Sequence, residues 1–181
     1  ELSDLITDVV NPLDGFQKKD YEKYFSDYLE EHRPVFRDLE DAYIYSDQKE
    51  ELLQSLAESL TLSVVKKLRK EPKKRGRSRK LTDYNMILVV YVFPALLKES
   101  HQAGEPFSRE VLKSWKEHFP KTNLHISTYE EIEEGFKKRY CYITTAVCQS
   151  LHRGDDCEEL VMLRDYRDSY LMGLANGQEV I

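Results

Sequence analysis

The chain has 181 residues, a length that suits one domain able to bury a core of its own. Its composition, with 40% hydrophobic and 33% charged residues but only seven glycines and six prolines, indicates a helix-rich globular chain and argues against a β-sandwich, a disordered tail or a membrane protein. The net charge is −6. The first residues, ELSDLITDVV, lack the basic and apolar parts of a secretory signal, so we expect a cytoplasmic protein.

The first helices are predicted from apolar spacing. Residues 1–15 form an irregular lead-in in which apolar positions such as Leu5 and Ile6 could dock as a short helical turn. Over residues 16–32, apolar and aromatic side chains recur every three or four positions, which predicts an amphipathic helix. Pro34 should end or kink that helix, and the residues after it are expected to form a second short helix.

The most regular repeat lies over residues 47–70, where leucines and valines recur every three or four positions. Asp47 and Glu50 have the form of a capping box at its start. The pattern predicts a long amphipathic helix that ends before Pro72.

Residues 66–80, KKLRKEPKKRGRSRK, hold ten basic residues and one acidic residue, a local charge of +9, so the rest of the chain carries −15. We call this stretch the basic segment, and we expect a mobile loop over residues 71–80 because Pro72 and Gly76 break the helical pattern and like charges repel. Its partner is either a polyanion such as nucleic acid or the protein's own acidic surface. The candidate polyanion-binding residues are Lys73, Lys74, Arg75, Arg77, Arg79 and Lys80.

The apolar run MILVVYVF, residues 86–93, is the longest in the chain and is too short by itself to span a bilayer. Its length and β-branched residues leave a buried strand open as an alternative, but no partner strand is predicted. We therefore predict a buried central helix over residues 84–97, kinked at Pro94.

Further helices are predicted towards the C-terminus. Ser108 should cap one, and either Ser127 with Glu130 or Thr128 with Glu131 should form the capping box of the next. Two more are expected beyond residue 143. The predicted fold is an all-α, compact bundle of about seven or eight helices around the central helix, in a single domain over residues 1–181.

Two spaced motifs carry a resemblance. CYITTAVC, residues 141–148, followed by LRDYRDSYL, residues 163–171, resembles the CFI-box, a bacterial module with the pattern C-F-I-A-T-A, a gap and L-R-x-F-R-D-x-x-L, and is similar to uncharacterised proteins of Firmicutes. Tyrosine replaces phenylalanine twice, and Thr144 stands for an alanine. The resemblance implies no reaction. It implies that Cys141 and the two arginines of the second motif matter together. Similar proteins continue with more helix after the second motif, which raises the question of whether the chain is truncated or processed at Ile181.

Cys141 is the candidate catalytic residue. It precedes an expected helix N-terminus and follows a lysine- and arginine-rich stretch, and both features favour a thiolate. A nucleophile also needs a base, and His152 lies about three helical turns away, so local geometry does not supply one. The alternative is a small buried cysteine.

A metal site would use Cys141, Cys148, His152 and Cys157. Cys148 and His152 are four residues apart and would share a helix face, but the paired-cysteine spacing of known zinc sites is missing. We therefore predict no metal.

Arg164 and Arg167 are three residues apart, share a helix face, and lie beside Asp168. Two guanidinium groups placed this way could bind a carboxylate or phosphate of a ligand. The alternative is a structural clamp on a neighbouring helix.

These patterns predict a cytoplasmic helical binding or regulatory module rather than an enzyme. We expect no cofactor, no membrane association, and another protein or a second copy of the chain as partner. Two alternatives stay open: a cysteine-dependent enzyme or thiol sensor centred on Cys141, and a nucleic-acid-associated protein that uses residues 66–80.

Overall fold

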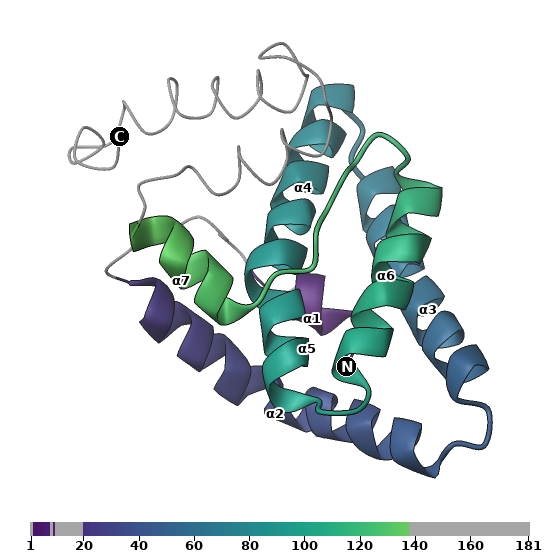
Figure 1. The fold of residues 1–181 in the computed structure, drawn as a ribbon. Coiled ribbons are helices and arrows are strands. Elements are labelled where there is room, and N and C mark those ends of the chain that lie inside the picture. The colour runs from purple at the N-terminus through teal and green to yellow at the C-terminus, as the bar shows by residue number, and fades with distance from the viewer. Residues whose placement is uncertain (1, 8, 10–19, 138–181) are drawn as a thin grey trace. The chain divides into compact units, whose positions relative to one another are not determined.

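The computed structural model describes residues 2–7, 9 and 20–137, which form helices and no strand (Figure 1). The all-α class is therefore confirmed for this part of the chain. The elements are α1 (Asp4–Thr7), α2 (Tyr21–Tyr45), α3 (Lys49–Arg69), α4 (Lys74–Ile87), the π-helical stretch η1 (Leu88–Val92), α5 (Phe93–Glu99), α6 (Gly104–His118) and α7 (Tyr129–Lys137).

The chain divides into two compact units, residues 1–134 and residues 135–181. The first unit contains almost all the described residues, and its core is the fold presented here. The prediction of a single domain over the whole chain stays a prediction.

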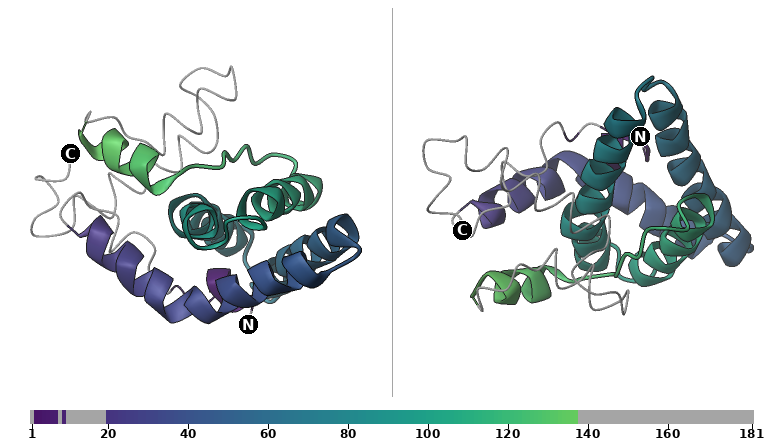
Figure 2. Two further views of the ribbon diagram at one scale, coloured as in Figure 1. Left: turned by 60° about the horizontal axis from the view of Figure 1, so that its bottom comes forward. Right: turned by 90° about the horizontal axis from the view of Figure 1, so that it is seen from above.

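A continuous helix of 26 residues, Lys74–Glu99, runs through the first unit and combines α4, η1 and α5. It contains the predicted central helix over residues 84–97, and most of its side chains from Met86 to Leu96 are buried. Helix α6 packs against α3 and α5, and α2 packs against α5 and α3, so the central helix is surrounded (Figures 1 and 2). The sequence pattern identified the centre of the core correctly.

Pro94 is accommodated by the π-helical stretch that precedes it. Proline has no backbone N–H, and its ring crowds the carbonyl four residues earlier, here that of Val90. The N–H of Phe93 bonds to the carbonyl of Leu88, five residues back, which is the wider π-helical spacing. The carbonyl of Val90 accepts a hydrogen bond of 2.7 Å from the hydroxyl of Tyr21 in α2. The helix therefore continues through Pro94.

The apolar run is part of a longer helix than the run itself suggests. Because α5 extends it past Pro94, Lys74–Glu99 is long and apolar enough to cross a membrane by length and composition alone. In the structure, 56% of its most apolar window is buried by the rest of the fold, as expected of a core helix.

Helix α2 runs from Tyr21 to Tyr45 without a break at Pro34, so the predicted division into two helices is wrong. Pro34 removes one helical hydrogen bond, to the carbonyl of Glu30, but both residues are exposed, so water can satisfy that carbonyl. The helix is bent rather than straight (Figure 2).

The mobile loop predicted over residues 71–80 is also wrong, because α4 begins at Lys74. Only residues 71–73 lie between α3 and α4. Pro72 lies just before the helix, where it causes no break, and Glu71 contacts the first turns of α4. These contacts offset part of the repulsion among the like charges of the basic segment.

Helix starts differ from the predicted caps in two places. α6 begins at Gly104, before the predicted cap Ser108, because the carboxylate of Glu40 in α2 accepts hydrogen bonds from the N–H groups of Gln102 and Ala103. This cap comes from a residue about sixty positions away, which no local pattern reveals. Asp47 likewise forms no capping box, because α3 begins at Lys49 with no side-chain cap.

The predicted cap of α7 is confirmed in one of its two forms. The hydroxyl of Thr128 accepts a hydrogen bond of 3.2 Å from the N–H of Glu131, and the carboxylate of Glu131 accepts one of 2.9 Å from the N–H of Thr128. The reciprocal pair is the capping box.

The N-terminal turn docks as expected. Leu5 and Ile6 of α1 are fully buried, and the carbonyl of Leu5 accepts a hydrogen bond of 2.9 Å from the buried hydroxyl of Tyr28. Burial raises the pKa of Tyr28 well above its usual value, so this hydroxyl stays protonated and keeps donating.

Candidate functional site

Residues 66–80 lie where α3 ends and α4 begins, two helices joined by a short connection (Figure 1). This stretch carries ten basic side chains. Every one of the ten is exposed. We call this surface the basic corner. Its members are Lys66, Lys67, Arg69 and Lys70 at the end of α3, and Lys73, Lys74, Arg75, Arg77, Arg79 and Lys80 at the start of α4.

The first turns of α4 project from the fold. Residues 74–80 are exposed apart from the half-exposed Gly76, residues 81–85 are half-buried, and Met86 is the first buried residue of the helix. Seven helical residues rise by roughly 10 Å, so about two turns extend beyond the packed part of the helix. Among the described residues, the central core helix therefore begins with an exposed cationic end.

The cations of this projecting end are distributed around the helix axis. At about 100° per residue, Arg75 and Arg79 share one side, whereas Lys74 and Arg77 share a side roughly 150° away. An ordinary surface helix keeps one side for the core, and here burial begins with the half-buried residues 81–85 and is complete at Met86.

Glu71 is the single acidic residue of the basic segment, and it connects the end of α3 to the first turns of α4. Its carboxylate lies 3.0 Å from the ammonium group of Lys80, and its backbone carbonyl accepts a hydrogen bond of 3.0 Å from Arg77. The hydrogen bond from Lys80 lowers the pKa of Glu71, and the same bond raises the pKa of Lys80. A Cβ at Gly76 would lie 2.6 Å from a carboxylate oxygen of Glu71, so glycine makes room for this side chain.

The charge on α4 opposes its helix dipole. Cations suit the last turn of α3, where Lys66, Lys67 and Arg69 lie, but the first turn of α4 holds cations and no acidic residue. Each such cation near a helix N-terminus is unfavourable by about 0.3–1 kcal/mol at low ionic strength. The start of α4 therefore has an excess of positive charge that an external anion would relieve.

The protein's own acids neutralise little of this surface within the described residues. Of the ten cations of the basic corner, Lys80 alone forms an ion pair there. Arg79 acts on Asp83 at longer range: burial raises the pKa of Asp83, and the charge of Arg79 opposes that rise. Lys67 likewise acts at longer range on Asp4 of α1. Among the described residues, the alternative in which the basic segment binds the acidic body is therefore supported by these two long-range interactions and by no ion pair outside the segment.

The other candidate sites of the sequence analysis lie outside the described residues. Cys141, Cys148, His152 and Cys157 belong to this group, as do Arg164, Arg167 and Asp168. Their proposed roles stay predictions. Within residues 2–7, 9 and 20–137, no three His, Cys, Asp or Glu side chains are close enough together to hold a metal ion.

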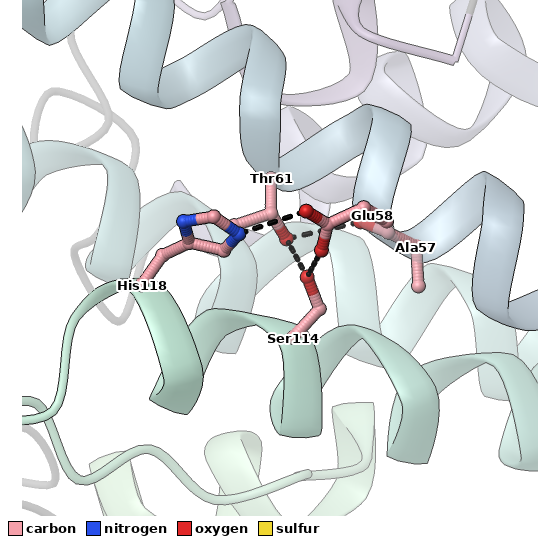
Figure 3. Close-up of polar contacts among 5 residues, drawn as sticks. All are labelled: Ala57, Glu58, Thr61, Ser114 and His118. Atoms are coloured by element: carbon pink, nitrogen blue, oxygen red, sulfur yellow. Dashed lines mark hydrogen bonds and ion pairs between the residues drawn. The ribbon is translucent and has the colours of Figure 1, made fainter.

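A polar cluster that the sequence analysis missed connects α3 with α6 (Figure 3). One carboxylate oxygen of Glu58 lies 2.9 Å from Nε2 of His118, and the other accepts a hydrogen bond of 2.8 Å from the hydroxyl of Ser114. The hydroxyls of Ser114 and Thr61 lie 2.9 Å apart. The two residues of α3 lie more than fifty positions from the two of α6, so no local motif could reveal the cluster.

The order of this cluster argues against nucleophilic catalysis. In a serine hydrolase the histidine lies between the serine and the acid, so that it can take the serine proton. Here Glu58 lies between Ser114 and His118, and the hydrogen bonds of both residues go to Glu58 or Thr61 instead of to each other. The hydrogen bond from His118, followed by that from Ser114, lowers the pKa of Glu58. The cluster is therefore a structural joint between α3 and α6.

A shallow hollow beside α6 is lined by Leu112, Trp115, Lys116, Thr122, Asn123 and Leu124. Its lining is largely apolar, and Lys116 is its single titratable side chain. It offers no paired acid and base for catalysis.

No protein-family model matches the chain, and neither a curated protein nor a solved structure matches it. A function for the chain is therefore inferred from the residues of the basic corner.

Proposed function

We propose that the chain is a helical binding module whose basic corner binds an anionic polymer of the nucleic-acid class. The observation that carries the proposal is the gathering of ten exposed cations at one helix junction, with Lys80 the one member in an ion pair among the described residues. An exposed surface of this kind attracts phosphates and releases their counterions.

Two further features support binding over a purely solubilising role. The projecting end of α4 is anchored in the core through Met86 and Ile87, so its cations are presented by a rigid element instead of a flexible tail. The excess positive charge at the start of α4 is also relieved when an anion binds, which adds to the affinity. A solubilising charge needs neither feature.

The test is the affinity for a fluorescently labelled nucleic acid of mixed sequence, measured with the full chain at salt concentrations from about 50 to 200 mM. If the corner contacts six or more phosphates, affinity should fall by about a thousandfold or more over this range. The six-residue variant replaces Lys73, Lys74, Arg75, Arg77, Arg79 and Lys80 with glutamine and should lose most of the binding.

A matched control separates position from net charge. Replacing six exposed cations elsewhere, namely Lys23, Arg37, Arg109, Lys113, Lys116 and Lys121, with glutamine removes the same total charge. This control should retain affinity far better than the six-residue variant. Equal losses in the two variants, or affinity that is insensitive to salt, would contradict the proposal.

A further inference from the structure

We infer that the anionic polymer is double-stranded DNA and that the projecting end of α4 enters its major groove. The inference rests on the proposed function and names the partner of the same surface. It is carried by two observations: about two turns of α4 extend beyond the packed part of the helix, and their cations lie on opposite sides of it.

The dimensions agree. An α-helix with its side chains is about 10–12 Å across, and the major groove of B-form DNA is about 12 Å wide. A helix can enter such a groove with any side that is exposed, and residues 74–80 are exposed apart from Gly76, which lies against Glu71. A helix packed along its whole length could offer one side at most.

The distribution of charge points to a groove instead of a flat surface. A helix inside a groove has a phosphate backbone on each side, so cations on both sides are useful. Arg75 and Arg79 would face one backbone, and Lys74 and Arg77 the other. Arg77 donates one of its five N–H groups to the carbonyl of Glu71 and keeps the others for a phosphate. A helix that lies on an anionic membrane needs an apolar side opposite its cations, and residues 74–80 include no apolar side chain.

Single strands are disfavoured by composition. Proteins that bind them combine cations with aromatic side chains on which the bases stack. The basic segment contains no aromatic residue, and the nearest one, Tyr84, is half-buried. The four cations at the end of α3, Lys66, Lys67, Arg69 and Lys70, lie beside the start of α4 and would contact phosphates flanking the groove.

Double-stranded RNA is the most stringent comparison, because it has a similar charge but a different shape. Its A-form major groove is deep and narrow, so a helix cannot enter. The experiment compares four probes at one salt concentration by fluorescence anisotropy: a DNA duplex of about two helical turns, the RNA duplex of the same sequence, single-stranded DNA, and vesicles that contain anionic lipid.

We expect the DNA duplex to bind at least about tenfold more tightly than the RNA duplex and the single strand. If RNA duplex or single strand binds as tightly as the DNA duplex, groove entry is wrong while the proposed polyanion binding stands. If no nucleic acid binds, or only the vesicles do, the proposed function fails together with the inference.

Two double variants test whether both sides of the helix contact phosphates. Lys74→Gln with Arg77→Gln, and Arg75→Gln with Arg79→Gln, should each reduce the salt dependence by about 1.8 in the log–log slope, because each removes two phosphate contacts. Thermal unfolding serves as the folding control, since all four side chains are exposed. An effect confined to one pair would mean that one side of α4 lies on a surface, and it would overturn groove entry.

Discussion

The hydroxyl of Tyr21 donates a hydrogen bond of 2.7 Å to the carbonyl of Val90, four residues before Pro94. This bond joins the start of α2 to the widened turn of the central helix. The central helix thus carries an internal proline without a break, and the same helix carries the projecting cationic end at its other terminus.

Replacing Tyr21 with phenylalanine should reduce the free energy of unfolding by about 1–2 kcal/mol, because a buried carbonyl loses its hydroxyl donor while the ring still fits. Urea denaturation measures this loss. Tyr24→Phe is the matched control, since Tyr24 is on the same helix and 45% exposed, and it should change stability little. Equal effects of the two substitutions would show that the bond to Val90 contributes nothing.

The cluster of Glu58, Ser114 and His118 should make stability depend on pH in the acid range. The pKa of Glu58 is lowered in the folded state, so its contribution is present above the unfolded-state pKa and is lost as pH falls through the folded-state pKa. The side chain of Glu58 is 43% exposed, so the contribution is at most about 1 kcal/mol after solvent screening.

Glu58→Gln should therefore destabilise the fold at neutral pH but flatten the dependence of unfolding free energy on pH below about 5. Glu117→Gln, an exposed acid on α6, serves as the control. An unchanged acid profile in Glu58→Gln would show that the bonds to His118 and Ser114 do not favour the ionised carboxylate.

Glu71 opposes the proposed binding, because it forms an ion pair with Lys80 and adds the single negative charge of the basic segment. Glu71→Gln should raise affinity for a nucleic acid by roughly threefold at low salt. It should also steepen the log–log slope of affinity against salt by about 0.9, the value for one added phosphate contact. Glu117→Gln provides a control of equal charge change at another site. If the two variants bind alike, the position of Glu71 has no influence.

Cys141 lies outside the described residues, so its reactivity is predicted from sequence alone. Alkylation rates of the three cysteines, followed by mass spectrometry from about pH 6 to 9, distinguish the two alternatives. A thiol sensor requires Cys141 to react faster than Cys148 and Cys157 at the low end of this range. If all three react slowly until the chain is unfolded, Cys141 is a buried structural residue.

Local patterns predicted the fold class and the position of the core helix, since periodicity and apolar run length directly reflect burial. They failed where contacts between distant residues determine where a helix begins or whether it continues. The start of α6 depends on Glu40, and the start of α4 depends on contacts from Glu71 that composition does not show. Pro34 is tolerated because the carbonyl it leaves unpaired is on the exposed side of α2.

The candidate site was partly predictable. Composition identified the six cations of residues 73–80 and suggested a polyanion, but it could not show that they surround a projecting helix end. That arrangement follows from how far the core extends along the central helix. The contact between Glu58 and Ser114 could not be predicted at all, because it depends on the packing of α3 against α6.

The most direct test of the central claim is the salt dependence of DNA binding by the unmodified chain and by the variant with residues 73, 74, 75, 77, 79 and 80 changed to glutamine. We expect a steep loss of affinity with salt in the unmodified chain, and a slope shallower by about 0.9 for each phosphate contact removed in the variant. Equal slopes in the two proteins, or no binding by the unmodified chain at low salt, would contradict a binding role for the basic corner.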